Sequence, residues 1–105
     1  MTDIKTLNDN FCKTFTGGQV LLTAGINAKP TNDVAYILSM VRNFNKFTPD
    51  NDSYGEHDFG SFDYKGDKIF WKIDYYDLNN QYLSANPADP NITNRVLTIM
   101  LAEEY

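Results

Sequence analysis

The chain has 105 residues, a length that fits one domain, and 42% of them are hydrophobic, so a core can form without cross-links. The single cysteine, Cys12, excludes a disulfide within the chain. The formal net charge is −5 and no run of basic residues occurs, which argues against direct binding of nucleic acid.

The start of the chain, MTDIKTLNDNF, has neither the basic nor the apolar stretch of a signal peptide. No apolar run approaches the roughly 20 residues that a membrane-spanning helix needs. These two features predict a cytoplasmic protein that does not bind a membrane.

The negative charge is concentrated in one part of the chain. Residues 48–77 hold eight acidic and three basic residues, whereas the rest of the chain holds six of each. The whole net charge therefore falls on this segment. Such a segment is either an ordinary solvated surface or a docking surface for a basic partner or a cation.

Residues 4–15 are predicted to form an amphipathic helix. Apolar residues recur there at spacings of three and four, the period of one helical face. They are Ile4, Leu7, Phe11 and Phe15. Thr2 or Asp3 can cap the start of the helix. The pair Gly17-Gly18 ends it, and the short apolar run that follows predicts a buried strand over residues 19–25.

A second helix is predicted over residues 32–46, opened by Pro30 and the polar residues after it. Its apolar stripe consists of Val34, Ile37, Leu38, Val41 and Phe44. The next segment, TPDNDSYGEH at residues 48–57, has the composition of a loop.

The runs DFGSFDYK and KIFWKIDY predict a β-hairpin over residues 58–75, with Gly66-Asp67 as a two-residue turn of type I′ or II′. This turn would place Phe62 opposite Trp71. One face of the hairpin is apolar and must be covered; it carries Phe62, Tyr64, Ile69, Trp71 and Ile73. The other face is mixed and mostly wet; it carries Phe59, Ser61, Asp63, Phe70, Lys72 and Asp74.

After a loop, residues 91–103 are predicted to form a last helix, with Asp89 as its N-cap and Pro90 in its first turn. The expected fold is a single α+β domain, residues 1–105, with the order α-β-α-β-β-α. A small antiparallel sheet of about three strands, including hairpin 58–75, would be covered on one face by three helices. These helices are 4–15, 32–46 and 91–103.

The single histidine, His57, is flanked by Glu56 and Asp58. Carboxylate neighbours favour the imidazolium form and can tune a catalytic base, but neighbours in an extended segment point in opposite directions. His57 is therefore either a loop residue that orders the backbone or part of a small acidic cluster. Asp58 and Asp74 would meet it at the open end of the hairpin.

Acidic residues before the hairpin raise the question of a metal site. Asp50-x-Asp52 is similar to the start of a calcium loop, but Tyr54 and Ser61 occupy its fifth and twelfth positions, so an EF-hand is excluded. A weaker calcium or magnesium site stays open as an alternative, with Asp50, Asp52, Glu56 and Asp58 as candidates. Without metal-ligand spacings such as HxxxH or CxxC, we assign no metal and no cofactor.

Cys12 and His57 are also the two partners that a nucleophilic dyad would need. Cys12 lies inside an amphipathic helix beside Phe11, whereas a reactive thiolate is stabilised at a helix N-terminus. We therefore expect a structural thiol and assign no catalytic residue.

The strongest functional signal is one of binding. Tyr54, Tyr76, Phe59 and Phe70 lie outside the predicted core face and among acids, and exposed rings of this kind make good contact residues. We predict a partner-binding surface built from these rings, His57 and the acids around them. Its residues are Asp50, Asp52, Tyr54, Glu56, His57, Asp58, Phe59, Asp63, Phe70, Asp74, Tyr76 and Asp77.

Four stretches carry a family resemblance: FTGGQVLLTAGI, FTPDNDSYGEHDFGSF, FWKIDYYD and ANPADPNITNRVLTIMLAEEY. From about Leu7 to Tyr105 the chain resembles a family of small bacterial proteins with a domain of unknown function. GEHDFG and KIDYYD are its distinctive motifs. The resemblance implies a proteobacterial origin, often on plasmids and other mobile elements, near genes that contend with host defences. It implies no reaction, cofactor or catalytic residue.

These observations predict a small, non-enzymatic, acidic protein-binding factor. It would block a basic surface on a host defence complex, such as one that binds nucleic acid, as an anti-CRISPR or antirestriction protein does. One alternative is a small enzyme or metal-binding protein that uses His57, Glu56, Asp58 and Asp74. Another is a toxin–antitoxin partner or plasmid maintenance factor. A concave pocket around His57 would favour chemistry, and an exposed convex hairpin would favour binding.

Overall fold

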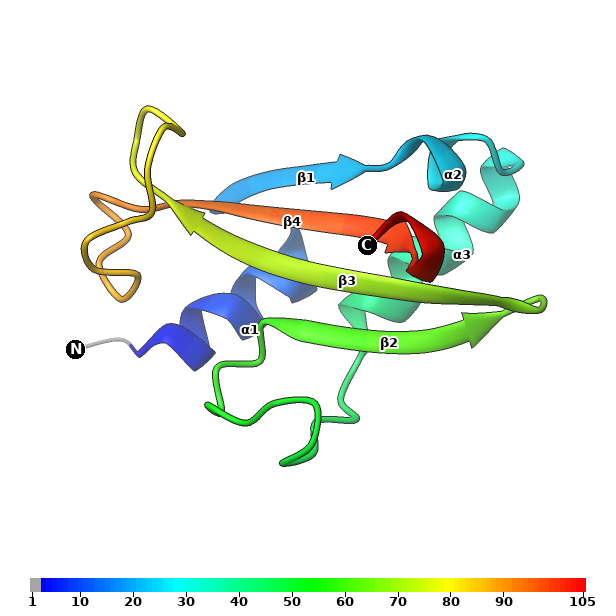
Figure 1. Ribbon diagram of the computed structural model, residues 1–105, viewed down its shortest axis with the longest axis horizontal. Helices are drawn as coiled ribbons and strands as arrows, with labels where there is room; N and C mark the ends of the chain where they lie inside the picture. The colour runs from blue at the N-terminus through cyan, green and yellow to red at the C-terminus, as the bar shows by residue number, and fades with distance from the viewer. Residues whose placement is uncertain (1–2) are drawn as a thin grey trace.

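The computed structural model describes residues 3–105 and shows an α+β fold (Figure 1). Within these residues, three α-helices and a four-stranded sheet follow the order α-β-α-α-β-β-β. The helices are α1 (Ile4–Thr14), α2 (Ala24–Asn27) and α3 (Thr31–Arg42). The strands are β1 (Gly18–Leu22), β2 (Phe59–Tyr64), β3 (Asp67–Tyr76) and β4 (Asn94–Leu101), followed by a 3₁₀ turn, η1 (Ala102–Glu104).

The sheet is mixed rather than purely antiparallel. Its strand order is β1-β4-β3-β2, and β1 runs parallel to β4 while the other pairs are antiparallel. Parallel neighbours need a long crossover. Here the crossover contains α2, α3 and the whole β2–β3 hairpin. The last strand along the chain, β4, therefore lies in the middle of the sheet, between β1 and β3 (Figure 1).

The prediction of a helix over residues 91–103 is wrong, because most of this segment is β4. The strand is buried on both sides: Leu97 and Ile99 lie in the core, and Val96 and Met100 are buried on the opposite side. A central strand with two buried faces shows no alternation of apolar and polar residues. For that reason, the sequence pattern of such a strand resembles that of a helix with a broad apolar face. The expected helix start at Asp89 is a turn, in which Asp89 accepts a hydrogen bond from the Asn91 amide.

Helix α1 follows the prediction closely. Asp3 caps it by accepting a hydrogen bond from the Thr6 amide at 2.8 Å, while Thr2 lies outside the described residues. The helix ends where Phe15 adopts a left-handed conformation, with φ 55°. Its buried side includes Phe11 and Cys12, which contact the core.

The strand predicted over residues 19–25 ends at Leu22, and a short helix follows it. This helix, α2, buries Ile26 completely. Helix α3 ends at Arg42, before the predicted residue 46, because Phe44 and the chain after it turn back toward the sheet. Three helices therefore contribute to the core on one face, but α2 takes the place of the helix expected at the C-terminus.

The hairpin has the predicted faces but not the predicted turn. The two turn residues are Lys65 and Gly66, whose φ values of 48° and 86° fit a type I′ turn. Phe62 pairs with Ile69 instead of Trp71, a displacement of two residues along the partner strand. Side chains alternate with a period of two, so a shift of two leaves each residue on its predicted face.

Trp71 lies at the centre of the core, where its side chain is 1% exposed. It packs edge-to-face against Phe44 and Phe47, with ring centroids 5.5 and 6.1 Å apart. Gly60 makes room for the indole, because a Cβ at this position would lie 2.4 Å from Nε1. Only glycine therefore fits opposite Trp71.

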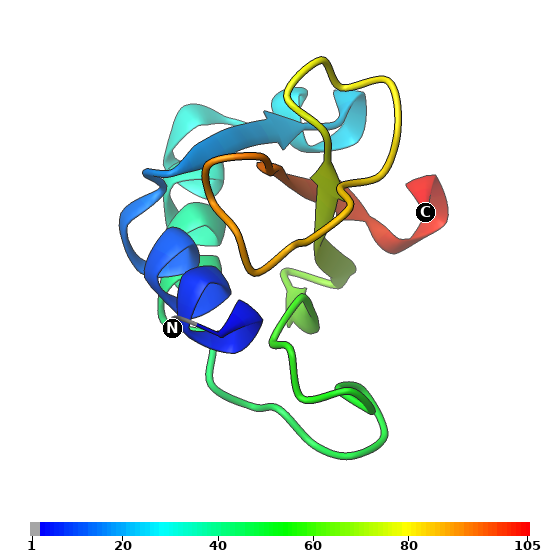
Figure 2. The same ribbon diagram turned by 90° about the vertical axis from the view of Figure 1, so that its left-hand side faces the viewer.

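Helices α1 and α3 lie together on one side of the sheet (Figures 1 and 2). We call the other side the open face. It carries Phe59, Asp63, Phe70, Lys72, Asp74 and Thr98, which alternate with the core residues along their strands. The loop after β3 and the C-terminal turn both project on the side of the open face (Figure 2).

Candidate functional site

The structure separates the residues predicted to bind a partner into three places. Asp52, Glu56, His57 and Asp58 lie in the segment that enters β2. Phe59, Asp63, Phe70, Asp74 and Tyr76 lie on the open face. Asp50 and Tyr54 are exposed in the loop before β2, and Asp77 begins the loop after β3.

His57 is held on three sides. Its Nδ1 lies 2.8 Å from Asp9 Oδ1 and its Nε2 lies 3.5 Å from Asp52 Oδ2. The ring stacks on Phe47, with centroids 3.8 Å apart and planes 3° from parallel. Its backbone amide also donates to the Asp52 carboxylate, which helps to hold the residue at φ 57°. Both ring nitrogens face a carboxylate of the protein, so this geometry favours the loop-ordering role over catalysis.

The carboxylates around His57 are not the sequence neighbours. Glu56 and Asp58 flank it in the chain, but Asp9 from α1 and Asp52 from the loop contact its ring. Within residues 3–105, no three His, Cys, Asp or Glu side chains are grouped so that they could hold a metal ion. The proposal of an irregular metal site in this segment therefore has no geometric support.

A buried hydrogen-bonded network lies next to His57, and the sequence prediction included only one of its four members, Glu56. Asn8 on α1 is completely buried, and Arg95 on β4 is 3% exposed. Asn8 Nδ2 donates to Tyr75 Oη at 2.8 Å and to the Glu56 carbonyl oxygen at 3.0 Å. Its Oδ1 accepts from Arg95 Nε at 2.9 Å. We call Asn8, Glu56, Tyr75 and Arg95 the buried network.

Tyr75 contacts both charged members of the buried network, Glu56 and Arg95. The Tyr75 hydroxyl donates to Glu56 Oε1 at 2.8 Å, and the Arg95 guanidinium lies over the tyrosine ring, 5.3 Å from its centroid. Burial raises the pKa of Tyr75, which keeps the phenol protonated and unsuitable as a base. Burial also lowers the pKa of Arg95. Each of the four residues thus has at least one hydrogen-bond partner inside the protein, as a structural network requires.

The sequence does contain weak signals for two of the missed residues, Asn8 and Arg95. Asn8 lies one turn after Ile4 and three residues before Phe11, so it interrupts the apolar stripe of α1. Arg95, Leu97 and Ile99 are two residues apart, so they share one face of a strand. Once the segment is known to be a strand, Arg95 is therefore placed on the core face. A polar residue on an apolar face indicates a buried hydrogen-bonded group.

Asp58 is the acid with the least favourable surroundings. Burial raises its pKa, and the negative charges of Glu56, Asp52 and Asp74 raise it further. Asp58 lies at the open end of the hairpin, where its carbonyl oxygen accepts from the Ile73 amide at 2.9 Å. The carboxylates that contact the His57 ring are Asp9 and Asp52, and not Asp58 and Asp74 as expected. A carboxyl whose pKa is raised in the folded state contributes stability at acidic pH and loses it as pH rises through that pKa.

We therefore expect Asp58→Asn to stabilise the protein at neutral pH, by less than about 1 kcal/mol because Asp58 is only partly buried. The amide removes a charge that its neighbours repel. Thermal unfolding at pH 7 measures the difference, and unfolding below about pH 4, where the wild-type carboxyl is protonated, should show little difference. A lower melting temperature for the variant at pH 7 would mean that the charge of Asp58 is stabilised by a contact.

Cys12 is a structural residue in this fold. Its side chain is buried, and burial together with the charge of Asp9 raises the pKa of the thiol to about 12. A thiol of this kind is protonated at neutral pH and is a poor nucleophile. The dyad with His57 therefore has no support.

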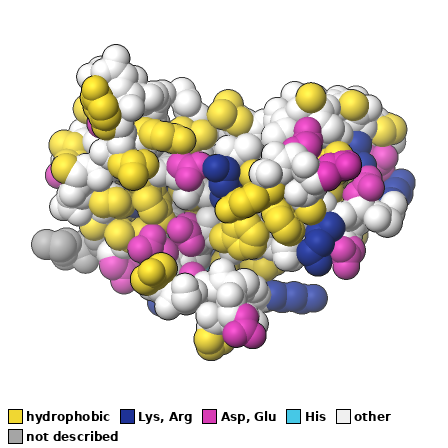
Figure 3. Space-filling model, in the orientation of Figure 1, with side chains coloured by type: hydrophobic (Ala, Val, Ile, Leu, Met, Phe, Trp, Pro, Cys, Tyr) yellow, Lys and Arg dark blue, Asp and Glu magenta, His cyan; other side chains and the backbone are white. Residues whose placement is uncertain are grey.

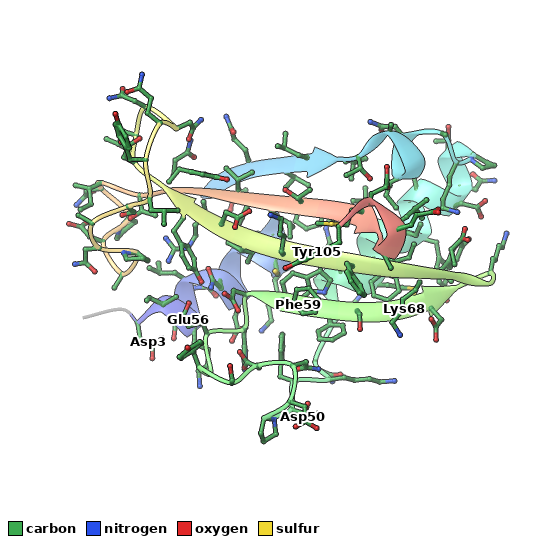
Figure 4. All side chains as sticks on the ribbon, in the orientation of Figure 1. Asp3, Asp50, Glu56, Phe59, Lys68 and Tyr105 are labelled. Carbon is green, nitrogen blue, oxygen red and sulfur yellow. The ribbon has the colours of Figure 1, made fainter. Side chains whose placement is uncertain are left out.

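The open face carries a cluster of three aromatic rings. Phe59 and Phe70 are 5.3 Å apart between centroids, and Tyr105 lies 5.8 Å from Phe70 and 6.4 Å from Phe59 (Figure 4). Tyr105 is nevertheless 75% exposed. Hydrophobic atoms form a patch at the centre of this face (Figure 3). We call Phe59, Phe70 and Tyr105 the aromatic cluster.

The position of Tyr105 is fixed by the residue before it. Glu104 accepts hydrogen bonds from the Thr23 hydroxyl at 2.6 Å, the Gly25 amide at 2.9 Å and the Leu101 amide at 2.9 Å. These bonds lower the pKa of Glu104. The carboxylate therefore ties η1 to the segment after β1 and holds the last residue over the sheet.

The loop over residues 77–83, which we call the apolar loop, has an ordered backbone. The Asp77 carboxylate accepts from the amides of Asn79 and Gln81 at 3.1 and 3.0 Å, and the Asp77 amide donates to the Tyr82 carbonyl oxygen at 2.8 Å. Leu83 also forms a β-bridge with Tyr76.

The apolar loop exposes large side chains that the sequence did not single out. Leu78, Tyr82 and Leu83 are 63%, 73% and 76% exposed. An ordered loop that holds three large apolar side chains in water is typical of a contact surface. No periodicity could predict it, because the exposure of a loop residue depends on the backbone around it.

The charged residues of the open face are largely paired with one another. Lys72 Nζ lies 3.0 Å from Asp74 Oδ2, and Lys68 Nζ lies 4.0 Å from Asp63 Oδ1. Asp63 is 80% exposed and Asp50 is exposed beside β2 (Figure 4). Of the predicted acids, these two are the most available to a partner, whereas Asp52 and Glu56 already hold His57 and Tyr75.

None of the helices within residues 3–105 has the length and apolar character that crossing a membrane would require.

Comparison with known proteins identifies a family but no characterised relative. No curated protein matches the chain, and no solved structure matches it. The model of one family, described as "Protein of unknown function (DUF3768)", matches residues 22–104. The match covers the end of β1, helices α2 and α3, the hairpin, the apolar loop and β4. The chain therefore belongs to this family of unknown function.

Proposed function

We propose that the protein is a non-enzymatic binding protein whose contact surface is the open face together with the apolar loop. The observation that carries this proposal is that the helices all pack on the other face of the sheet, while large apolar side chains stand in water on this one. The aromatic cluster lies on that face by the alternation along β2 and β3, and the apolar loop projects on the same side (Figure 2).

The chemistry of this surface suits a protein partner. Tyrosine and phenylalanine provide large contact areas with few rotatable bonds, and tyrosine adds a hydrogen-bonding group. The apolar loop and η1 are both fixed by hydrogen bonds to carboxylates, from Asp77 and Glu104. A contact surface that is ordered before binding loses less conformational entropy when it binds.

The charge of the protein favours a partner with a basic surface. The net charge is −5, and Asp50 and Asp63 place exposed carboxylates beside β2 and on the open face. Opposite charges steer association and select partners more than they add to affinity. A host defence complex that binds nucleic acid has a basic surface of this kind. We propose inhibition of such a complex, of anti-CRISPR or antirestriction type, as the specific role that the resemblance to mobile-element proteins favours.

Two other roles remain as alternatives. A toxin–antitoxin partner or plasmid maintenance factor would use the same surface with another partner. An enzyme or metal-binding protein based on His57 has less support, because its ring nitrogens face Asp9 and Asp52 and because Glu56 is held by Tyr75.

We expect the association rate with a basic partner to fall as ionic strength rises, and Asp50→Lys combined with Asp63→Lys to slow association strongly. Folding should be almost unaffected, because exposed charges contribute little to stability. The partner is first captured from host lysate on immobilised wild-type protein, and its association rate is then measured at several salt concentrations.

Asn10→Lys is the control variant, because it adds positive charge on an exposed position of α1. It should change the association rate much less than the double variant does. An association rate that is independent of salt and equal in all variants would remove electrostatic steering from the mechanism.

A further inference from the structure

We propose that a pocket beside α3 binds a small organic molecule that carries a phosphate group. The pocket has a volume of about 740 Å³ and lies along the C-terminal half of α3, with Lys13 of α1 contributing to its wall. Arg42, Ser39 and Asn43 also line it. Helices α1 and α3 lie side by side on the face of the sheet opposite the open face (Figure 2). The pocket is thus distinct from the proposed protein-binding surface.

The pocket is positively charged in an otherwise acidic protein. Lys13 and Arg42 are its charged lining residues, and no acid lines it. In the part of the chain that the structure describes, neither cation has a carboxylate within 4.0 Å. Among the other lysines, Lys29, Lys65, Lys68 and Lys72 are each paired with an aspartate, whereas Lys5 and Lys46 have no carboxylate within 4.0 Å among the described residues. The two positive charges of this pocket are therefore not neutralised by a neighbouring acid, although the protein as a whole has more acids than bases.

Arg42 is already oriented for binding. Its guanidinium lies over the Phe15 ring, 4.4 Å from the centroid. Stacking of this kind restrains the guanidinium and leaves its in-plane N–H groups for an acceptor. The Ser39 hydroxyl and the Asn43 side chain lie close together on the same helix end, where Asn43 Nδ2 donates to the Ser39 carbonyl oxygen at 2.9 Å. Ser39 and Asn43 therefore give the pocket neutral hydrogen-bonding groups in addition to its two cations.

Lys13 and Arg42 also lie in the last turns of their helices, where cations stabilise the helix dipole. This role explains one positive charge at each helix end. It does not require the two charges to share a pocket without an acid. A phosphate monoester carries a charge of about −1.5 to −2 near neutral pH, which matches the two cations. Arginine binds phosphate through two parallel hydrogen bonds.

The size of the pocket favours an organic phosphate over the free ion. Small-molecule sites typically measure roughly 300–1,000 Å³, so this volume leaves room for more than a phosphate. Leu38 and Phe44, both partly buried, provide an apolar wall for the rest of the ligand.

The test is a titration of the isotopically labelled protein followed by NMR, with adenosine monophosphate, inorganic phosphate and adenosine as separate probes. We expect adenosine monophosphate to shift the amide signals of residues 39–45, Lys13 and the Arg42 side-chain N–H. Inorganic phosphate should shift the same signals with weaker affinity, and adenosine should shift them little. Removing one charged contact, in Lys13→Ala or Arg42→Gln, should weaken binding of adenosine monophosphate about tenfold or more.

Lys5→Ala is the matched control, because Lys5 is an exposed lysine in the first turn of α1 and does not line the pocket. It should leave the affinity unchanged. Since Arg42→Gln also removes the stack on Phe15, its melting temperature is measured, and Lys13→Ala, at an exposed position, gives the same test without that loss. Absence of shifts at millimolar probe would overturn the proposal, as would equal weakening by Lys5→Ala or equal binding of adenosine. The two cations would then serve only the helix ends.

Discussion

Replacing Trp71 with alanine is expected to lower the free energy of unfolding by about 3–5 kcal/mol. The indole is almost completely buried, and Phe44 and Phe47 pack edge-on against it. Its removal leaves a large cavity beside Gly60, which has no side chain to fill it. A small domain is stable by roughly 5–15 kcal/mol, so this variant would be close to unfolded.

Chemical denaturation of wild type and variant measures this loss. Phe70→Ala is the matched comparison, because Phe70 is the preceding residue on β3 and lies on the open face, where it is only partly buried. Its loss should be clearly smaller. Equal losses for the two variants would mean that the hairpin faces are assigned wrongly.

Asn8→Ala is expected to lower the free energy of unfolding by about 1–3 kcal/mol, through a different mechanism. The asparagine joins Arg95 to Tyr75 and to the Glu56 carbonyl oxygen. Without its oxygen, the Arg95 guanidinium loses one of its hydrogen-bond acceptors while it stays buried. Removing one member of a buried network costs more than the bond itself, because the remaining groups keep the penalty of desolvation.

Asn10→Ala provides the control, since Asn10 is two residues along the same helix and exposed. Alanine favours helix formation more than asparagine does, so this variant should be neutral or slightly more stable. Denaturation of both variants gives the comparison. Equal stability of Asn8→Ala and Asn10→Ala would show that the buried network contributes nothing to the fold.

The parts of the fold that were predicted correctly are those with a clear period. Helices α1 and α3 each have one apolar face, and the hairpin alternates between an apolar and a mixed face. The predicted turn lies one residue too late in the chain, which shifts the pairing of the two strands by two residues. A shift of two leaves every side chain on its face, so Trp71 was still predicted on the core face. Strand β4 could not be predicted in this way, because a strand buried on both sides has no period to read.

Less of the candidate site could be predicted than of the fold. His57 was correctly placed among acids, but its contacts are Asp9 and Asp52, which only the packing of α1 against the loop brings together. Tyr82 and Leu83 are exposed in a loop whose backbone is ordered by hydrogen bonds to the Asp77 carboxylate. Contacts between distant segments and the conformation of an irregular loop leave no pattern in the sequence.

The acidic segment has a more divided role than its composition indicates. Glu56 and Asp52 hold the buried network and His57, so they stabilise the segment that leads into β2. Asp50 and Asp63 remain exposed. A partner would therefore be attracted by a few acids but contact mainly aromatic and aliphatic side chains.

The most direct test of the proposed contact surface is the affinity of the captured partner for the double variant Tyr82→Ser, Leu83→Ser. Both side chains are exposed, so the variant should fold normally. Tyr36→Ser is the control, because Tyr36 is an equally large ring, 58% exposed, on α3. If the open face and the apolar loop bind the partner, the double variant should bind at least about tenfold more weakly and the control as wild type does. Equal affinity of the double variant and wild type, or equal weakening by Tyr36→Ser, would contradict the proposed surface.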